Sequence, residues 1–430
     1  AFYACGGPKF LLLMLLSIAI NYAGGLLAGP AHRPRTRRLG MTLAVVLGLA
    51  LLGWFKYAGF FGEMLHALLP VVPVPQVTLP IGISFFTFQG LSYVIDVYRG
   101  DAAVQRDPLK LALYIAFFPQ LVAGPIVRYT TVAEEIDERH ESVSEFSAGA
   151  VRFLFGLGKK MLLANAVARI ADAAFAAVMP SVLFAWLGAV AYTFQIYFDF
   201  SAYSDMAIGL GRMFGFHFLE NFNYPYVARS VTEFWRRWHI SLSTWFRDYV
   251  YIPLGGNRCS RARNVWNLFV VWFLTGMWHG ASWNFIAWGL WFFVLLVGEK
   301  FLWGKALERL PSLVRHAYAM VLVVFSWVLF RAETLTAAAA YFAAMFGSSG
   351  VWCGSRVVYY ALEFWPELLC CCIAALPVKQ WLETALQKRD AAPARAVLTW
   401  GPKLAAMALL ACSYCKLVTG SFNPFIYFRF

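Results

Sequence analysis

The sequence predicts an all-α polytopic membrane protein, and three features of its composition support this fold class. Of the 430 residues, 60% are hydrophobic, 18% are aromatic and only 14% are charged, whereas soluble domains have about 25% charged residues. The mean hydropathy is +0.61, and apolar stretches of about 20 residues, the length that crosses a bilayer, recur along the chain. We therefore expect one transmembrane domain over residues 1–430 rather than the roughly three soluble domains that this length would suggest.

The apolar stretches predict a series of candidate spans, some of which are too short to cross a bilayer alone. They cover residues 9–28, 41–61, 111–127, 149–178, 183–200, 264–276, 281–302, 317–330, 357–376 and 404–419. The loop at 30–38 is rich in arginine, which places it on the cytoplasmic side by the positive-inside rule. The sequence has no initiator methionine, and we expect a further span before residue 1.

Two stretches differ from ordinary spans. Segment 78–100 mixes Pro80, Gly82 and Asp96 with apolar residues, which is typical of broken or re-entrant backbone beside a cavity. Segment 229–250 predicts an amphipathic helix along the membrane interface or beneath the bundle, although a surface anchor without catalytic role is an alternative. At 100° per residue its aromatic face comprises Trp235, Trp238, Leu242, Trp245 and Tyr249, opposite Arg229, Glu233, Arg236, Thr244 and Arg247.

The net charge of +13 and the eight cysteines exclude several classes of protein. Lysine and arginine lie in short segments between apolar stretches, which favours membrane topology, anionic lipid or a phosphate-bearing cytosolic donor over nucleic acid. The cysteines lack the paired spacing of a zinc site, and buried thiols behave as small hydrophobic groups. We therefore expect neither a metal site, a disulfide framework nor a bound cofactor.

Two of the seven histidines, His239 and His279, lie in sequence contexts that suggest chemistry. An ionisable residue in a membrane segment is costly and marks a functional site. Gly276 and Gly280 flank His279 and leave room for a substrate, and the stretch also contains Trp278, Ser282 and Asn284. A neutral imidazole in an apolar pocket resists protonation, so it is available as a general base near neutral pH. A satisfied core histidine is the alternative.

Polar residues also interrupt the apolar stretch at 195–215. They are Asp199, Ser201, Tyr203, Ser204 and Asp205. Such a cluster lines a cavity or makes hydrogen bonds between helices, and either aspartate could orient an imidazole. The sequence ends in SFNPFIYFRF, where Tyr427 offers a hydroxyl that an adjacent base such as His279 could activate for acylation. An aromatic belt at the membrane interface is the alternative for this ending.

Taken together and in this order, several segments resemble the membrane-bound O-acyltransferase family. The resemblance is to the bacterial branch that includes the membrane proteins of alginate and peptidoglycan O-acetylation and of teichoic acid D-alanylation. The segments are LPIGISFFTFQGLSYVIDVYRG, FFPQLVAGPIVR, FDFSAYSDMAIGLGRMFG, NFNYPYVARSVTEFWRRWHISLSTWFRDYVYIPLGGNR, FLTGMWHGASWNFIAWGLW and FIYFRF, and they span roughly residues 78–430.

The resemblance implies a ring of tilted transmembrane helices, with re-entrant and in-plane helices, around a central tunnel. His279 matches the family's invariant histidine, and His239 matches a second histidine of this branch. The family transfers an acyl group from a cytosolic thioester to a hydroxyl acceptor. Acetyl-coenzyme A is the donor implied for acetylating members, and a carrier-protein thioester for the D-alanylating member. The ending resembles a tail whose tyrosine is acylated transiently, which makes Tyr427 the expected relay nucleophile in residues 421–430.

We therefore expect an O-acyltransferase in the bacterial cytoplasmic (inner) membrane that acetylates an extracytoplasmic polysaccharide, such as alginate or peptidoglycan. A separate SGNH-type O-acetyltransferase outside the membrane is the expected partner. Arg236 and Arg237 are candidates for docking the donor. The predicted tunnel lining comprises Trp278, Gly280, Ser282, Asn284, Asp199, Ser201 and Asp205. A proton-coupled transporter with the two histidines as relay groups, or a scaffold without acyl-transfer chemistry, are the alternatives.

Overall fold

A computed structural model describes residues 3, 7–388, 392–420 and 425, and every regular element in this part of the chain is a helix. The all-α prediction is therefore confirmed. By its contacts the chain divides into two compact units. Unit 1 comprises Ala1–Gly149 and Ala207–Leu219, and unit 2 comprises Ala150–Met206 and Glu220–Phe430. The single family domain over 1–430, with its ring of helices around a tunnel, stays a prediction.

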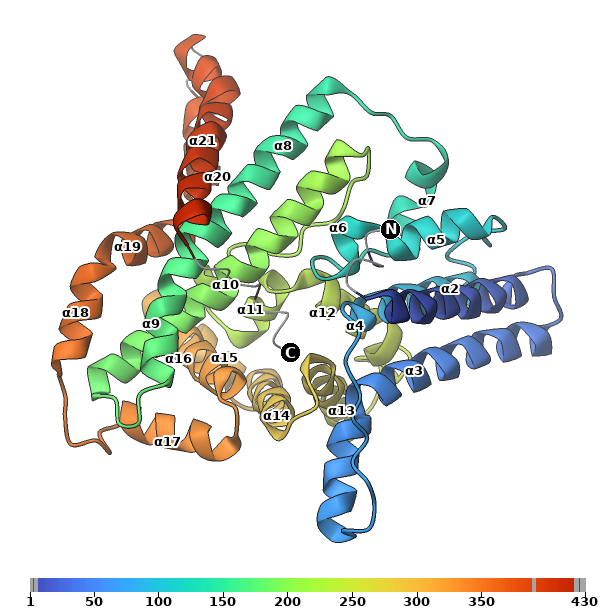
Figure 1. Cartoon of the computed structure of the whole chain (residues 1–430), viewed down its shortest axis with the longest axis horizontal. Coiled ribbons are helices and arrows are strands. Elements are labelled where there is room, and N and C mark those ends of the chain that lie inside the picture. The colour runs from blue at the N-terminus through green and yellow to red at the C-terminus, as the bar shows by residue number, and fades with distance from the viewer. Residues whose placement is uncertain (1–2, 4–6, 389–391, 421–424, 426–430) are drawn as a thin grey trace. The chain divides into compact units, whose positions relative to one another are not determined.

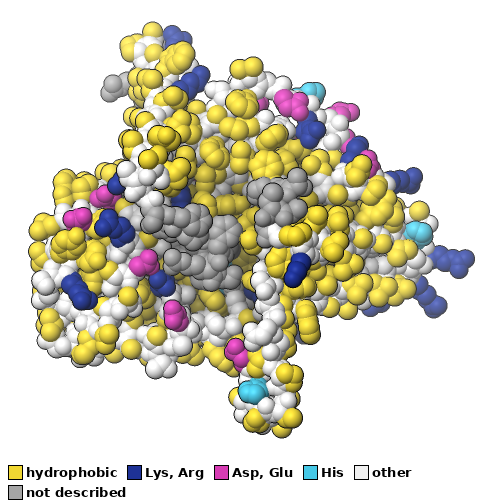
Figure 2. All heavy atoms as spheres, viewed as in Figure 1, with side chains coloured by type: hydrophobic (Ala, Val, Ile, Leu, Met, Phe, Trp, Pro, Cys, Tyr) yellow, Lys and Arg dark blue, Asp and Glu magenta, His cyan; other side chains and the backbone are white. Residues whose placement is uncertain are grey.

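Unit 1 is built around three helices that approach closely, α2 (Pro8–Ala28), α3 (Pro34–Leu68) and α4 (Ile83–Arg99) (Figure 1). A short turn joins α2 to α3, and lysine and arginine side chains gather at this end of the two helices (Figure 2). The unit continues with α5 (Pro108–Ala116), α6 (Phe118–Leu121), α7 (Tyr129–Asp137), the start of α8 (Val143–Gly158) and the end of α10 (Val182–Met213).

Small residues allow the helices of unit 1 to touch. A Cβ atom at Gly90 of α4 would lie 2.3 Å from the Asn21 amide of α2, and one at Gly40 of α3 would lie 2.4 Å from Leu27. The expected break in segment 78–100 lies before the helix rather than within it. Gly82 has φ 77° and ends the non-helical stretch, and α4 then runs without interruption to Arg99.

Unit 2 contains the remaining helices of the described chain. They are the end of α8, η1 (Lys159–Ala164), α9 (Asn165–Phe175), most of α10, η2 (Pro225–Val227), α11 (Val231–Arg237), α12 (Ile240–Phe246), η3 (Arg247–Tyr251), α13 (Arg261–His279), α14 (Trp283–Gly298), η4 (Glu299–Trp303), α15 (Gly304–Glu308), α16 (Ser312–Arg331), α17 (Leu335–Met345), α18 (Ser355–Glu363), α19 (Trp365–Ala374), α20 (Val378–Gln387) and α21 (Ala392–Thr419). An aromatic core joins α10, α11, α14 and α16.

Six helices of the described chain are long and apolar enough to cross a membrane. They are Pro8–Ala28, Pro34–Leu68, Val182–Met213, Trp283–Glu308, Ser312–Arg331 and Ala392–Thr419. Apolar side chains cover much of the face in Figure 2, as expected for surfaces that contact lipid. The prediction of a protein with several spans is therefore confirmed.

Two predicted spans are broken rather than continuous. The stretch 357–376 forms α18 and α19, which meet at Phe364 with a bend of 64°. The stretch 111–127 divides at Phe117 into α5 and the short α6. In both places a proline occupies the first turn of the second helix, where its missing N–H and fixed φ favour a new helix start.

The single amphipathic helix predicted for 229–250 is wrong. The chain leaves the helical conformation after Arg237 and starts again at Ile240, because His239 has φ 44° and ψ 53°. This left-handed conformation is unfavourable for a residue with a Cβ atom, so an α-helix cannot run through it. The burial still follows the predicted faces, since Trp235, Trp238, Leu242 and Trp245 are buried and Arg229, Arg236 and Arg247 are exposed.

Helices α13 and α14 form a tightly packed hairpin that carries His279 at its turn (Figure 1). Backbone touches backbone along this contact. A Cβ atom at Gly289 would lie 2.3 Å from the carbonyl oxygen of Trp272, and one at Gly276 would lie 2.4 Å from that of Phe285. Because a carbonyl oxygen cannot rotate away as a side chain can, any side chain at these positions must move a helix.

We expect Gly289→Ala to lower the free energy of unfolding by about 1–3 kcal/mol, the typical cost of overpacking. Thermal unfolding of the purified protein in detergent, followed by tryptophan fluorescence, measures this loss. Gly401→Ala is the control, since its Cβ atom would meet only Val397 at an ordinary 3.7 Å. Equal stability of the two variants would show that the α13–α14 contact is looser than described.

Candidate active site

His279 is the last residue of α13, and its ring is enclosed by aromatic side chains. The centroid of the imidazole lies 4.8 Å from that of Trp288 in α14 and 5.3 Å from that of Phe330 in α16. The ring of the preceding residue, Trp278, is 5.0 Å away. Three helices therefore fix the position of this imidazole, and only 8% of the residue is exposed.

The turn after His279 is held by packing and by one amide. A Cβ atom at Gly280 would lie 2.2 Å from the ring of Phe285, so that ring covers the turn directly. The side-chain amide of Asn284 donates to the backbone oxygen of Ala332, just after α16, and so ties the start of α14 to the end of α16. Ser282 occupies the N-cap position of α14. Asn284, which was predicted to line the tunnel, thus uses its side-chain amide to hold two helices together.

His239 lies beside the same tryptophan. Its ring centroid is 5.8 Å from that of Trp278 and 4.7 Å from that of Phe200 in α10, and the residue is fully buried. Trp278 therefore contacts both imidazoles, although 39 intervening residues separate them in the sequence. The structure thus brings together the two histidines that the sequence singled out, in one apolar and aromatic environment.

A single asparagine, Asn221, holds the turn at His239. Its side-chain oxygen lies 3.2 Å from His239 Nδ1 and accepts from the backbone N–H and the hydroxyl of Ser241 at 3.2 and 2.8 Å. Its side-chain nitrogen donates to the hydroxyl of Ser204 at 3.1 Å, and its backbone oxygen accepts from Ile240 N–H at 2.9 Å. Asn221 is itself only 1% exposed.

These bonds define the protonation of His239. The Ser241 backbone N–H can only donate, so the Asn221 atom that it meets is the carbonyl oxygen. That oxygen can only accept from His239, which places the proton on Nδ1 and leaves Nε2 as an acceptor. Burial lowers the pKa of His239 to about 3, so the ring is neutral at physiological pH.

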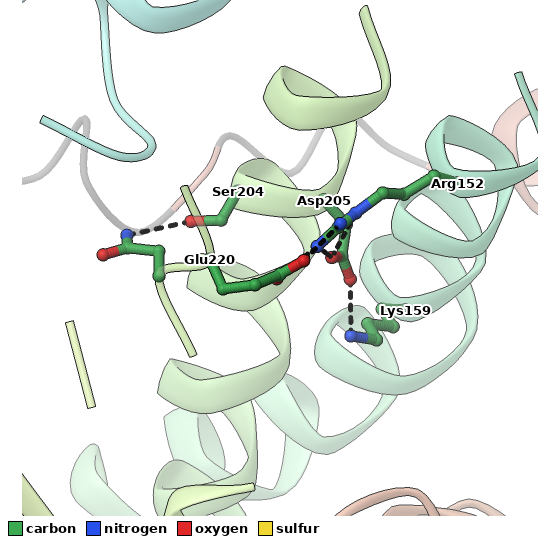
Figure 3. A network of polar contacts seen from close by, with 6 residues as sticks. Arg152, Lys159, Ser204, Asp205 and Glu220 are labelled. Atoms are coloured by element: carbon green, nitrogen blue, oxygen red, sulfur yellow. Dashed lines mark hydrogen bonds and ion pairs between the residues drawn. The ribbon is translucent and has the colours of Figure 1, made fainter. Parts of the chain in front are cut away.

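The aspartates suggested as orienting groups are held by cations. Asp205 accepts from Arg152 at 2.9 Å and from Lys159 at 2.6 Å, and Arg152 also binds Glu220 at 2.6 Å (Figure 3). The second aspartate forms a buried pair with Lys160. The orienting contact at His239 comes instead from Asn221. The sequence did not indicate this residue, because it lies in a loop without a periodic pattern.

The remaining predicted site residues are the two arginines of α11, a serine of α10 and the tyrosine of the C-terminal tail. Arg237 is bound within the fold, to the Glu233 carboxylate at 2.9 Å and to the backbone oxygen of Asn223 at 3.2 Å, whereas Arg236 is exposed. Ser201 is buried on α10. Tyr427 and most of the tail at 421–430 lie outside the described residues, which include only Phe425 from this segment.

Glu299 is a further residue that the sequence did not indicate. Its carboxylate accepts from the backbone N–H groups of Val231 and Thr232 at 2.7 and 2.8 Å, and from the Thr232 hydroxyl at 2.6 Å. A carboxylate on the first N–H groups of a helix satisfies donors that have no partner within the helix. Glu299 in η4 therefore fixes the start of α11, the helix that leads to His239.

The model of the membrane-bound O-acyltransferase family matches residues 99–338. The chain belongs to this family. It is 41% identical to the "Probable alginate O-acetylase AlgI" of Azotobacter vinelandii, over 100% of the chain and 92% of that protein.

The names of two further relatives mention other polymers, peptidoglycan and teichoic acid. The chain is 34% identical to the "Peptidoglycan O-acetyltransferase" of Helicobacter pylori, over 81% of the chain and 72% of the relative. It is 29% identical to the "Teichoic acid D-alanyltransferase" of Bacillus subtilis, over 58% of the chain and 67% of the relative. The chain is thus an acyltransferase with several membrane spans.

We expect Asn221→Ala to lower the free energy of unfolding by about 1–3 kcal/mol, because it leaves buried donors of His239 and Ser241 without their acceptor. Acyl-transfer activity should also fall, since the imidazole loses its orienting contact. Thermal unfolding and donor turnover measure the two effects. Asn223→Ala is the matched control on the same loop, because Asn223 is exposed and its two hydrogen bonds with Arg237 use only its backbone atoms. Comparable losses in both variants would contradict the role of Asn221.

The buried His239 also predicts a dependence of stability on pH. The unfolded chain takes up a proton at this residue near pH 6.5, whereas the folded protein does so only near pH 3. The free energy of unfolding should therefore decrease as the pH falls through this window, by about 1.4 kcal/mol per pH unit for one proton.

The matched variant is His239→Asn, because asparagine tolerates the left-handed conformation and does not titrate. Unfolding midpoints between pH 7 and pH 4 should fall less steeply with pH in this variant than in the parent protein. Parallel curves would mean that folding does not change the pKa of His239, which would contradict this prediction.

Proposed function

We propose that the chain is a polysaccharide O-acetyltransferase of the alginate and peptidoglycan type in the bacterial cytoplasmic membrane. It takes an acetyl group from cytosolic acetyl-coenzyme A and passes it across the membrane for transfer to a sugar hydroxyl. The relatives named as O-acetylases support acetyl as the acyl group. The relative named as a D-alanyltransferase keeps D-alanyl as a second candidate acyl group. A carrier-protein thioester, the donor that the family resemblance implies for D-alanylation, is the second candidate donor.

The observation that carries this proposal is the enclosed pair of imidazoles on either side of Trp278. In the proposed reaction His279 takes the proton of an acceptor hydroxyl as that oxygen attacks the thioester carbonyl. The tetrahedral intermediate collapses with cleavage of the C–S bond. The leaving thiolate then receives the proton from the imidazolium, so the products are an acetyl ester and free coenzyme A thiol.

The environment suits this chemistry. Aromatic side chains from α13, α14 and α16 surround His279 and exclude water, which strengthens each electrostatic interaction within the site. His239 is neutral, and Asn221 holds it beside the same tryptophan that contacts His279. It therefore contributes alignment of the nucleophile rather than positive charge at the oxyanion.

Tyr427 is the proposed first acceptor of the acetyl group. A charged coenzyme cannot cross the bilayer, whereas a small acyl group can cross as an ester of the protein. An SGNH-type transferase outside the membrane then moves the acetyl group from the tyrosyl ester to the polysaccharide. Family membership favours this enzyme over the proton-coupled transporter and over a scaffold without chemistry.

We expect incubation of the purified protein with acetyl-coenzyme A to add one acetyl group, detected by intact mass and located on Tyr427 by peptide sequencing. His279→Ala should lower the rate of this labelling by about 10²–10⁴-fold, the usual contribution of a general base. His140→Ala is the control, because this histidine is exposed and lies in unit 1.

Other outcomes separate the alternatives. Labelling from a carrier-protein thioester alone would replace the donor but keep the acyl transfer. Unchanged labelling in His279→Ala would remove the general base from the proposal. Proton-coupled flux into liposomes without labelling from either thioester would support the transporter instead.

A further inference from the structure

A buried ion pair joins η1 to α10, next to the residue of α10 that contacts His239. Lys160 and Asp199 approach to 2.5 Å, and both side chains are less than one-tenth exposed. Lys160 belongs to η1, a π-helical segment that continues α8. The preceding Lys159 binds Asp205, so two successive lysines both meet carboxylates of α10. Such π-helical segments are frequent at functional sites.

Phe425, from the C-terminal tail at 421–430, packs against this pair. The Lys160 ammonium lies 4.6 Å from the centroid of the phenyl ring, which is the geometry of a cation–π contact. The ring also meets Tyr203 of α10 edge-on, with centroids 5.1 Å apart. The last helix, α21, packs on η1, and Leu409 comes within 3.0 Å of a Cβ atom built at Gly158.

We propose that Lys160, Asp199 and Tyr203 form an anchor for the C-terminal tail, with Phe425 as the residue that they hold. Asp199 fixes the ammonium of Lys160, and the ammonium and Tyr203 together bind the phenyl ring. This inference rests on the proposed function, because it gives the tail a defined place from which Tyr427 is presented. Lys160 is in this sense a positioning residue and does not touch the reacting atoms.

The arrangement on α10 connects the anchor to the histidines. Asp199 and Tyr203 are four residues apart and share one face of the helix. Phe200 and Ser204, one position further along the chain, share the neighbouring face. That second face contacts His239 directly through Phe200 and supports Asn221 through Ser204. The anchor and the support of His239 therefore belong to the same turn of α10.

Chain geometry sets the reach of the anchored tail. Each residue extends the chain by at most about 3.6 Å, so the Cα atom of a residue two positions from Phe425 lies within about 7 Å of it. Tyr427 is two positions away. Holding the phenyl ring of Phe425 against Lys160 and Tyr203 would therefore limit how far the proposed nucleophile can move from the anchor.

The location of Phe425 is tested first, without any assay of activity. Phe425 is replaced by the photo-cross-linking residue p-benzoylphenylalanine, and the illuminated protein is mapped by peptide mass spectrometry. We expect cross-links to peptides that contain Lys160 or Tyr203. The same replacement at Tyr414, which is exposed on α21, is the control and should not give these products. Cross-links from residue 425 only to other parts of the chain would overturn the proposal.

The role of the anchor is tested with Phe425→Leu and Phe425→Trp. Leucine keeps the apolar bulk but has no aromatic face, whereas tryptophan has the strongest cation–π attraction. Acetyl occupancy of Tyr427 at a fixed early time should fall roughly 2–30-fold in the leucine variant, the range expected for loss of one such contact. The tryptophan variant should retain the parent value. Equal occupancy in the leucine variant and the parent would also overturn the proposal.

The two tests separate the anchor from the proposed reaction. If the parent protein acquires no acetyl group on Tyr427 from either thioester, the relay fails. The cross-linking result still decides whether the tail is held at Lys160. Cross-links at the expected peptides together with labelling at another hydroxyl would keep the anchor and reassign the acceptor.

Discussion

The position of His239 depends on the hydrogen bonds of one buried amide. Asn221 binds the imidazole, both donors of Ser241 and the backbone of Ile240, and it is itself held by Ser204. These bonds stabilise a left-handed residue between α11 and α12, whose strain would otherwise favour a continuous helix. Without the break, the helical register would carry His239 away from Trp278. The amide therefore determines both the local backbone and the composition of the candidate site.

His279 is held by aromatic packing, whereas His239 is held by hydrogen bonds. The imidazole is placed by rings from three helices, and α13 and α14 touch through their backbones at Gly276 and Gly289. Close backbone contact by small residues is the usual means of joining helices in a membrane, where apolar side chains gain little by leaving lipid. The same hairpin thus packs two helices together and orients the imidazole of His279. Its environment is apolar, so its interactions with a reacting substrate are strong.

The sequence predicted the features that depend on composition and local pattern. Apolar length predicted the helical membrane fold. The glycines beside His279 were expected to leave room for a substrate, whereas in the structure Phe285 occupies the space beside both of them. It did not predict the break at His239, because the helical spacing of Trp235, Trp238 and Leu242 continues across it. Asn221 and Glu299 were missed since each acts on a segment distant in the sequence, and polar pairing of this kind leaves no periodic signal. The aspartates of α10 were expected to line a cavity or to make hydrogen bonds between helices, but their pairing with successive lysines depends on the π-helical register of η1.

That register has a consequence for how this protein tolerates insertions and deletions. A π-helical segment accommodates one more residue than an α-helix within the same turn, and an α-helix advances about 100° per residue. Deletion of a single residue within Lys159–Ala164 would return the segment to α-helical winding and turn one lysine away from its carboxylate. Such a deletion would leave a carboxylate of α10 without its cation, even if both lysines and both aspartates remained in the sequence.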